Sequence, residues 1–167
     1  DGITIGESAF SRCSSLTKIT IPSTVTKIEN KAFNECSSLK QLTILSDDIE
    51  FGEKVFNGFQ KLELKVYQSI PNNLFNNCDT LTNITVSCPI TRIGKNAFYN
   101  CTSLKEIIIP SSVTSIEDKA FSLCNSITQI EIPSSVTKIG KEALCGCRFL
   151  AQIIIHPSIK VISDYLF

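Results

Sequence analysis

The sequence predicts an α/β repeat fold, a solenoid of units of about 23 residues that each contain short parallel strands and short helical turns. A bulky apolar anchor recurs along the chain in steps of 23, 23, 19, 23, 23, 23 and 23 residues. A repeat of this length is typical of stacked coils, because one coil alone cannot bury its apolar face. The anchors are Phe10, Phe33, Phe56, Phe75, Phe98, Phe121, Leu144 and Phe167.

Two periodicities alternate inside one unit, as the unit that begins at Phe98 shows. Residues 107–109 alternate inward and outward, which indicates a short strand, and Pro110 ends it by removing a backbone donor. A second extended piece is expected over residues 113–116. The apolar spacing over residues 116–124 favours one or two helical turns with one face inward.

One unit departs from this frame. The step from Phe56 to Phe75 is four residues short, and the Pro turn and the Val after it are missing. In the preceding unit Asp48 stands at the usual Val position and Leu45 at the usual Pro position. We expect a local bulge or bend there. Drift in a tolerant loop and a shaped binding notch both remain possible explanations.

The composition bounds the class of protein. Hydrophobic residues make up 43% of the 167 residues, and 16 basic residues balance 16 acidic ones. This composition is typical of a folded domain. The sequence has no basic cluster that would favour nucleic acid and no apolar run long enough for membrane insertion. We expect a single domain over residues 1–167, with about seven repeats, as a piece of a longer array.

Most of the eight cysteines share one repeat position, which predicts a column of free, buried thiols. A single file does not converge on a tetrahedral zinc site, and stacked neighbours lie slightly too far apart for disulfides. Cys88 and Cys145 lie outside the column, and Cys88 is expected to be the most exposed thiol. The column comprises Cys13, Cys36, Cys78, Cys101, Cys124 and Cys147.

No catalytic constellation is found. His156, the single His, falls at a turn position of the repeat, and no phosphate-binding or calcium loop occurs. We therefore predict a protein that is not an enzyme, with no catalytic residues, no metal site and no cofactor. Asn83 and Asn100 begin matches to the glycosylation pattern, which is weak.

The outward rows of the first strand of each unit form the candidate protein-binding face. These rows are polar and nearly neutral with two outward Ile residues, which suits a protein or peptide partner better than nucleic acid. Thr and Ile are also simply good strand formers, so each single residue has a structural explanation as well. The face comprises Lys18, Thr20, Gln41, Thr43, Lys65, Asn83, Thr85, Glu106, Ile108, Gln129, Glu131, Gln152 and Ile154.

The repeat resembles the leucine-rich repeats of the BspA-like, Treponema-pallidum-type class. The recurring pattern is I-[GE]-x-x-A-F-x-x-C-x-S-L-x-x-I-x-I-P-S-S-V-T-x, and residues 93–114 and 116–137 match it nearly throughout. The resemblance covers the whole chain and is weakest over residues 45–70. It implies a right-handed leucine-rich-repeat solenoid and an occurrence on bacterial and protist surfaces, with adhesion to host matrix proteins such as fibronectin or to other cells. It carries over no catalytic or ligand residues.

Three functions compete at this point. The first is a surface or secreted adhesion module that recognises a host or matrix protein. The second is an intracellular, cytoplasmic scaffold that binds a protein through the same face, which free thiols favour. The third is a run of structural spacer repeats.

Overall fold

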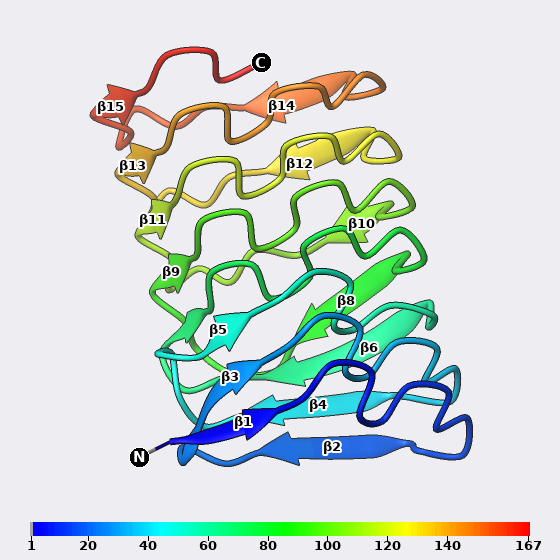
Figure 1. Ribbon diagram of the computed structural model, residues 1–167. Helices are drawn as coiled ribbons and strands as arrows, with labels where there is room; N and C mark the ends of the chain where they lie inside the picture. The colour runs from blue at the N-terminus through cyan, green and yellow to red at the C-terminus, as the bar shows by residue number, and fades with distance from the viewer. Residues whose placement is uncertain (1) are drawn as a thin grey trace.

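The computed structural model describes residues 2–167 and shows flat coils stacked one above another from the N-terminus to the C-terminus (Figure 1). Each full coil carries one strand on each side of the stack. The even-numbered strands lie on one side: β2 (Lys18–Ile21), β4 (Gln41–Ile44), β6 (Lys61–Lys65), β8 (Asn83–Val86), β10 (Glu106–Ile107), β12 (Gln129–Glu131) and β14 (Gln152–Ile154). The odd-numbered strands lie on the other: β1 (Ile3–Ile5), β3 (Val25–Ile28), β5 (Glu50–Phe51), β7 (Ser69–Ile70), β9 (Arg92–Ile93), β11 (Ser115–Ile116), β13 (Lys138–Ile139) and β15 (Val161–Ile162).

All strand pairs are parallel and join equivalent strands of neighbouring coils, so the predicted solenoid with parallel strands is confirmed. The even strands form a sheet of order β10-β8-β6-β4-β2 and a separate pair β12-β14. The odd strands form the sheets β1-β3-β5 and β15-β13-β11-β9-β7. Each side of the solenoid thus has one interruption, and the two interruptions fall between different coils.

The predicted helical turns are wrong, because no helix occurs within residues 2–167. In each turn segment, the residue two positions before the anchor and the residue two positions after it have left-handed backbones. Around Phe98 these residues are Asn96 (φ 53°) and Asn100 (φ 56°). A left-handed residue cannot continue a right-handed helix. The segment is instead a series of tight turns, such as the one closed by the Phe98 carbonyl and the Cys101 amide at 3.2 Å.

The turn segments also link one coil to the next through a third ladder of hydrogen bonds. The amide of Phe98 donates to the carbonyl of Ala120 in the next coil at 2.8 Å, and the amide of Phe121 donates to Ala143 at 2.8 Å. The side chains of left-handed Asn residues also bond between coils, since the Asn100 side-chain amide donates to the Asn77 side-chain oxygen at 2.9 Å. The two strand sides and the turn segments therefore each contribute hydrogen bonds between coils, which satisfy backbone groups that the core buries.

The anchor residues form one aromatic column through the core. Phe98 and Phe121 stack at 5.2 Å with an angle of 3° between the rings. The column is disturbed at the short unit, where the rings of Phe56 and Phe75 lie 6.3 Å apart and tilt by 57°. The column is also uncovered at its N-terminal end, where Phe10 is 45% exposed because its coil has only one neighbour.

The short unit interrupts the odd-strand side between β5 and β7. In the following coil the amide of Gly94 donates to the carbonyl of Ile70 at 2.8 Å, and the equivalent bond recurs along the stack. The residue that would donate to the Phe51 carbonyl is Pro71, which has no amide proton. At the unit where a bulge or bend was expected, the odd-strand sheet is broken, and Pro71 removes one hydrogen bond that would join the two coils.

The coils alternate between two types, a feature that the 23-residue period alone does not reveal. One type has Asn or Asp three residues before the anchor, and the next type has Gly four residues before its anchor. The side-chain oxygen of Asn72 accepts the amide of Lys95 at 2.8 Å, directly over Gly94. Equivalent contacts join Asn30 to Glu53 and Asp118 to Lys141, each at 2.8 Å. The structural repeat is thus a pair of coils.

Candidate protein-binding face

The even-numbered strands present the candidate face predicted from the sequence. Along each strand one residue points into the core and the next points outward, as the burial of Ile19 and Ile21 and the exposure of Lys18 and Thr20 show in β2. All thirteen predicted residues lie on this side of the solenoid and reach solvent, with Thr43 and Asn83 half-buried.

Pairing between strands differs from the predicted rows at β6. Lys65 pairs with Thr43 as the predicted row has it. On the other side the row placed Thr85 beside Lys65, but Thr85 pairs with Glu63. The two-residue offset therefore lies between β6 and β8, within the short unit from Phe56 to Phe75. The predicted rows also missed Glu63, and the continuous alternation of residues 61–65 was the signal that could have placed it.

The Glu63 carboxylate is hydrogen-bonded to two other side chains of this side of the solenoid. It accepts hydrogen bonds from the Ser87 hydroxyl at 2.9 Å and from the Gln41 amide at 3.0 Å. These two bonds lower the pKa of the Glu63 carboxyl, with Lys65 contributing a smaller effect. The network joins β4, β6 and the residue that follows β8, so it links side chains of three neighbouring coils.

A groove of about 760 Å³ crosses the face at the interruption between β10 and β12. Ile108 and Ile154 both line this groove and are 74% and 47% exposed. Glu106, Gln129 and Glu131 line it as well, so an apolar floor has an acidic and amide rim. Isolated exposed Ile residues are ordinary, but two in one hollow of a polar face form a patch of the kind that partners cover.

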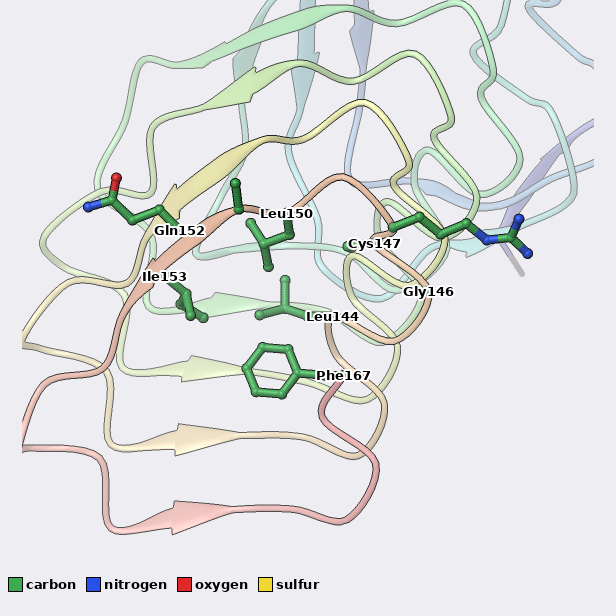
Figure 2. Close-up of a pocket in the computed structure, with 9 residues that line it drawn as sticks. Leu144, Gly146, Cys147, Leu150, Gln152, Ile153 and Phe167 are labelled. Carbon is green, nitrogen blue, oxygen red and sulfur yellow. The ribbon is translucent and has the colours of Figure 1, made fainter.

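A second, smaller hollow lies in the last coil. Leu144, Ile153 and Phe167 face a space of about 340 Å³ (Figure 2). Leu144 replaces the Phe of the anchor column at this level, and Phe167 beyond it is exposed. The hollow is therefore part of the open end of the core.

The cysteine column is present, and all eight cysteines are free. Each buried thiol donates to the anchor carbonyl of the preceding coil, as Cys101 does to Phe75 at 3.1 Å and Cys124 to Phe98 at 3.1 Å. Burial raises the pKa of the Cys78 thiol to about 12, and it also raises the pKa values of Cys101 and Cys124. These protonated thiols are structural hydrogen-bond donors.

The most exposed thiol is Cys13, and the expectation of Cys88 was wrong. Cys88 is half-buried because its sulfur contacts the backbone of Val66, accepting from the amide at 3.3 Å. Cys13 belongs to the column, but no coil among residues 2–167 covers it on that side. Position in the stack, which a single repeat does not encode, decides this exposure.

The described residues contain no group of three or more His, Cys, Asp and Glu side chains placed to hold a metal ion. His156 is half-buried, and its carbonyl closes a turn with the amide of Ile159 at 3.1 Å, as its repeat position predicted. Within residues 2–167 no helix has the length and apolar character needed to cross a membrane.

Comparison with known proteins identifies the repeat. A family model described as "BspA type Leucine rich repeat region" matches residues 2–66 and 68–167 in six copies. No curated protein matches the chain.

Solved structures support the same fold. The chain is similar to a leucine-rich repeat protein from Bacteroides ovatus, with 29% identity and a TM-score of 0.68 over 90% of this chain and 39% of that one. It is also similar to a leucine rich cell surface protein from Faecalibacterium prausnitzii, with 30% identity and a TM-score of 0.53 over 90% of this chain and 42% of that one. The chain thus spans about two fifths of the length of these proteins. The pneumococcal vaccine antigen PcpA, at 22% identity and a TM-score of 0.52 over 90% of this chain and 47% of that one, shares the fold.

Proposed function

The chain belongs to the BspA-type leucine-rich repeat family, and we propose that it is a non-catalytic module that binds a protein partner through its even-strand face. Leucine-rich repeat solenoids are a type of protein-interaction module, because their stacked strands present a long, regular surface. The finer proposal is adhesion, with a host or matrix protein as partner and the cell surface or the secreted fraction as location.

The observation that carries this proposal is the groove around Ile108 and Ile154. Its apolar floor and polar rim follow the general plan of protein interfaces, in which a few desolvated apolar side chains contribute most of the affinity. The volume of about 760 Å³ is large enough to accept several side chains of a partner. The remainder of the face is neutral and mixed in charge, which favours complementarity to a protein over attraction to a polyanion.

The description of the F. prausnitzii protein as a cell surface protein supports the adhesion reading. The free thiols favour the alternative, an intracellular scaffold that uses the same face. A signal peptide or membrane anchor in the full-length protein would decide for the surface module.

The test is a binding assay on immobilised matrix proteins, fibronectin among them, with the double variant Ile108→Asp/Ile154→Asp. Two carboxylates on the groove floor should weaken binding about tenfold or more, because they would be desolvated without partners. The matched control is Ile3→Asp, which changes an exposed Ile on the odd-strand side and should leave binding intact.

Two outcomes would contradict the proposal in different ways. If the double variant binds as tightly as the unaltered chain, the groove is not the binding site. If the unaltered chain binds no matrix protein, adhesion by these repeats fails and the scaffold and spacer readings gain support.

A further inference from the structure

A further hollow lies outside the proposed binding face, at the turns that lead into the odd-numbered strands. It has a volume of about 830 Å³ and lies where the odd-strand side is interrupted between β5 and β7. Asp47, Asp48, Tyr67 and Ser69 line it from the coils on each side of the interruption, and Arg92 lines it from the next coil. Neither the family nor its repeat pattern predicts this hollow, because it results from the one irregular unit.

The hollow contains two side chains that the regular repeat would bury as Val. In regular coils this position holds Val25, Val113 or Val136, all of them buried. In the two irregular coils it holds Asp48 and Tyr67, and both reach solvent, with Tyr67 64% exposed. Asp48 and Tyr67 both line the hollow, so a carboxylate and an aromatic ring face the same space.

The other two charged side chains that line the hollow, Asp47 and Arg92, are hydrogen-bonded to neighbouring residues. The Asp47 carboxylate accepts the amides of Gln68 at 3.4 Å and Ser69 at 3.3 Å, which replaces part of the missing sheet pairing. The Arg92 guanidinium donates to the Ser69 hydroxyl and to the Asn72 side-chain oxygen, each at 3.1 Å. Asp48, by contrast, forms no ion pair with any residue in 2–167, although Lys27 and Glu50 pair nearby at 3.3 Å.

We propose that this hollow binds a Lys or Arg side chain of a protein partner, with the ammonium or guanidinium group between the Tyr67 ring and the Asp48 carboxylate. An aromatic face and a carboxylate are the two groups that attract an organic cation, the first through its ring quadrupole and the second by a charge-assisted hydrogen bond. The Ser23 and Ser46 hydroxyls, which also line the hollow, offer acceptors for the remaining protons of the cation. The site does not depend on the even-strand face, so either proposal can fail alone.

The test uses capped seven-residue peptides of Gly and Ser with one central side chain. Peptides with Arg, Lys, Gln or Glu at the centre are titrated into the 167-residue chain and followed by NMR shifts of the amides of residues 46–48 and 67–69. The Arg and Lys peptides should bind with dissociation constants in the range of about 1 mM, because a single exposed cation site yields little free energy. The Gln and Glu peptides should cause no saturable shifts.

Variants then assign the binding to the two residues. Asp48→Asn and Tyr67→Ala should each weaken binding of the Arg peptide about threefold. Tyr67→Phe keeps the ring face and should leave this binding unchanged. Ile108→Asp/Ile154→Asp should leave peptide binding unchanged and serves as the control for the other face. All four variants change exposed side chains, so far-UV circular dichroism should confirm that each remains folded.

Three results would overturn the proposal. The first is equal binding of the Gln and Arg peptides, and the second is tighter binding of the Glu peptide, which would place Arg92 at the centre of recognition. The third is saturable binding of an uncharged oligosaccharide such as maltoheptaose in the hollow that survives Asp48→Asn, which would identify the hydroxyl-rich lining as a sugar site.

Discussion

At the scale of single residues, backbone geometry explains choices that composition leaves obscure. Left-handed positions recur twice per coil and are occupied by Asn, Lys, Glu and Ser as well as Gly. Asn tolerates this conformation best among residues with a Cβ, and Asn73, Asn77, Asn96 and Asn100 all occupy it. Gly94 is required for another reason, since a Cβ there would lie 2.6 Å from the Ile70 carbonyl oxygen and 2.7 Å from the Asn72 amide nitrogen.

This close approach predicts that Gly94→Ala lowers the free energy of unfolding by about 1–3 kcal/mol, because two coils must separate slightly to admit the methyl group. Urea denaturation measures the change. Gly6→Ala is the matched control: it changes the equivalent residue of the first coil, where no atom lies within 4 Å of the new Cβ. The control should leave the free energy of unfolding unchanged or raise it slightly, because Ala gives the unfolded chain less conformational freedom than Gly does. Equal losses in both variants would refute the coil-pair contact.

At the scale of elements, the cysteine column behaves as a unit because desolvation acts on each thiol. The pKa of Cys147 is raised to about 11 and that of Cys78 to about 12 by burial, and those of Cys101 and Cys124 are raised as well. In the unfolded chain these thiols would titrate near their ordinary value of 9.0. Above that pH the unfolded state holds fewer protons than the folded state, so rising pH favours unfolding.

We therefore expect the free energy of unfolding to be insensitive to these thiols below about pH 8 and to fall as the pH rises from about 9 toward 12. Each thiol contributes a slope of at most about 1.4 kcal/mol per pH unit in that window. Urea denaturation at successive pH values measures the slope. The double variant Cys101→Ala/Cys124→Ala removes two of the thiols and should show a shallower decline, although its stability at pH 7 is lower. An identical decline would mean that the thiols do not cause it.

At the scale of the whole molecule, the two interruptions are staggered. The odd-strand side is broken between β5 and β7, but the even strands β4, β6 and β8 are continuous there. The even-strand side is broken between β10 and β12, but the odd strands β9, β11 and β13 are continuous there. Every boundary between these coils therefore has sheet pairing on at least one side. This pairing couples the N-terminal and C-terminal halves.

This arrangement predicts one cooperative unfolding transition. In hydrogen exchange followed by mass spectrometry, peptides that cover residues 25–51 and 115–139 should lose protection at the same urea concentration. Repeat arrays lose cooperativity when the coupling between neighbours is weak. If the two segments unfold at clearly separate concentrations, the continuous strands across each interruption do not couple the halves. The first coil is the internal reference and should exchange earlier, since it has one neighbour only.

Much of this architecture follows from sequence because each coil repeats the same local rule. The steps between Phe10 and Phe167 predicted the stacked coils, the parallel strands and the cysteine column, since equivalent residues of identical coils must lie in register. The outward placement of Ile108 and Ile154 also followed, because side chains alternate along a strand. The sequence also located the irregular unit between Phe56 and Phe75.

Only the tertiary structure decided features that depend on contacts between coils or on the place of a coil in the stack. The turn segments are not helical, because left-handed residues such as Asn96 satisfy hydrogen bonds to the next coil that a helix would direct within its own. Cys13 and Phe10 share repeat positions with buried residues but are exposed, because burial in a solenoid requires a neighbour on each side. The hollow beside Asp48 and Tyr67 lies at the irregular unit, where β5 and β7 do not pair. The sequence by itself therefore determined the coil and its period, and the packing of unlike coils decided where the surface opens.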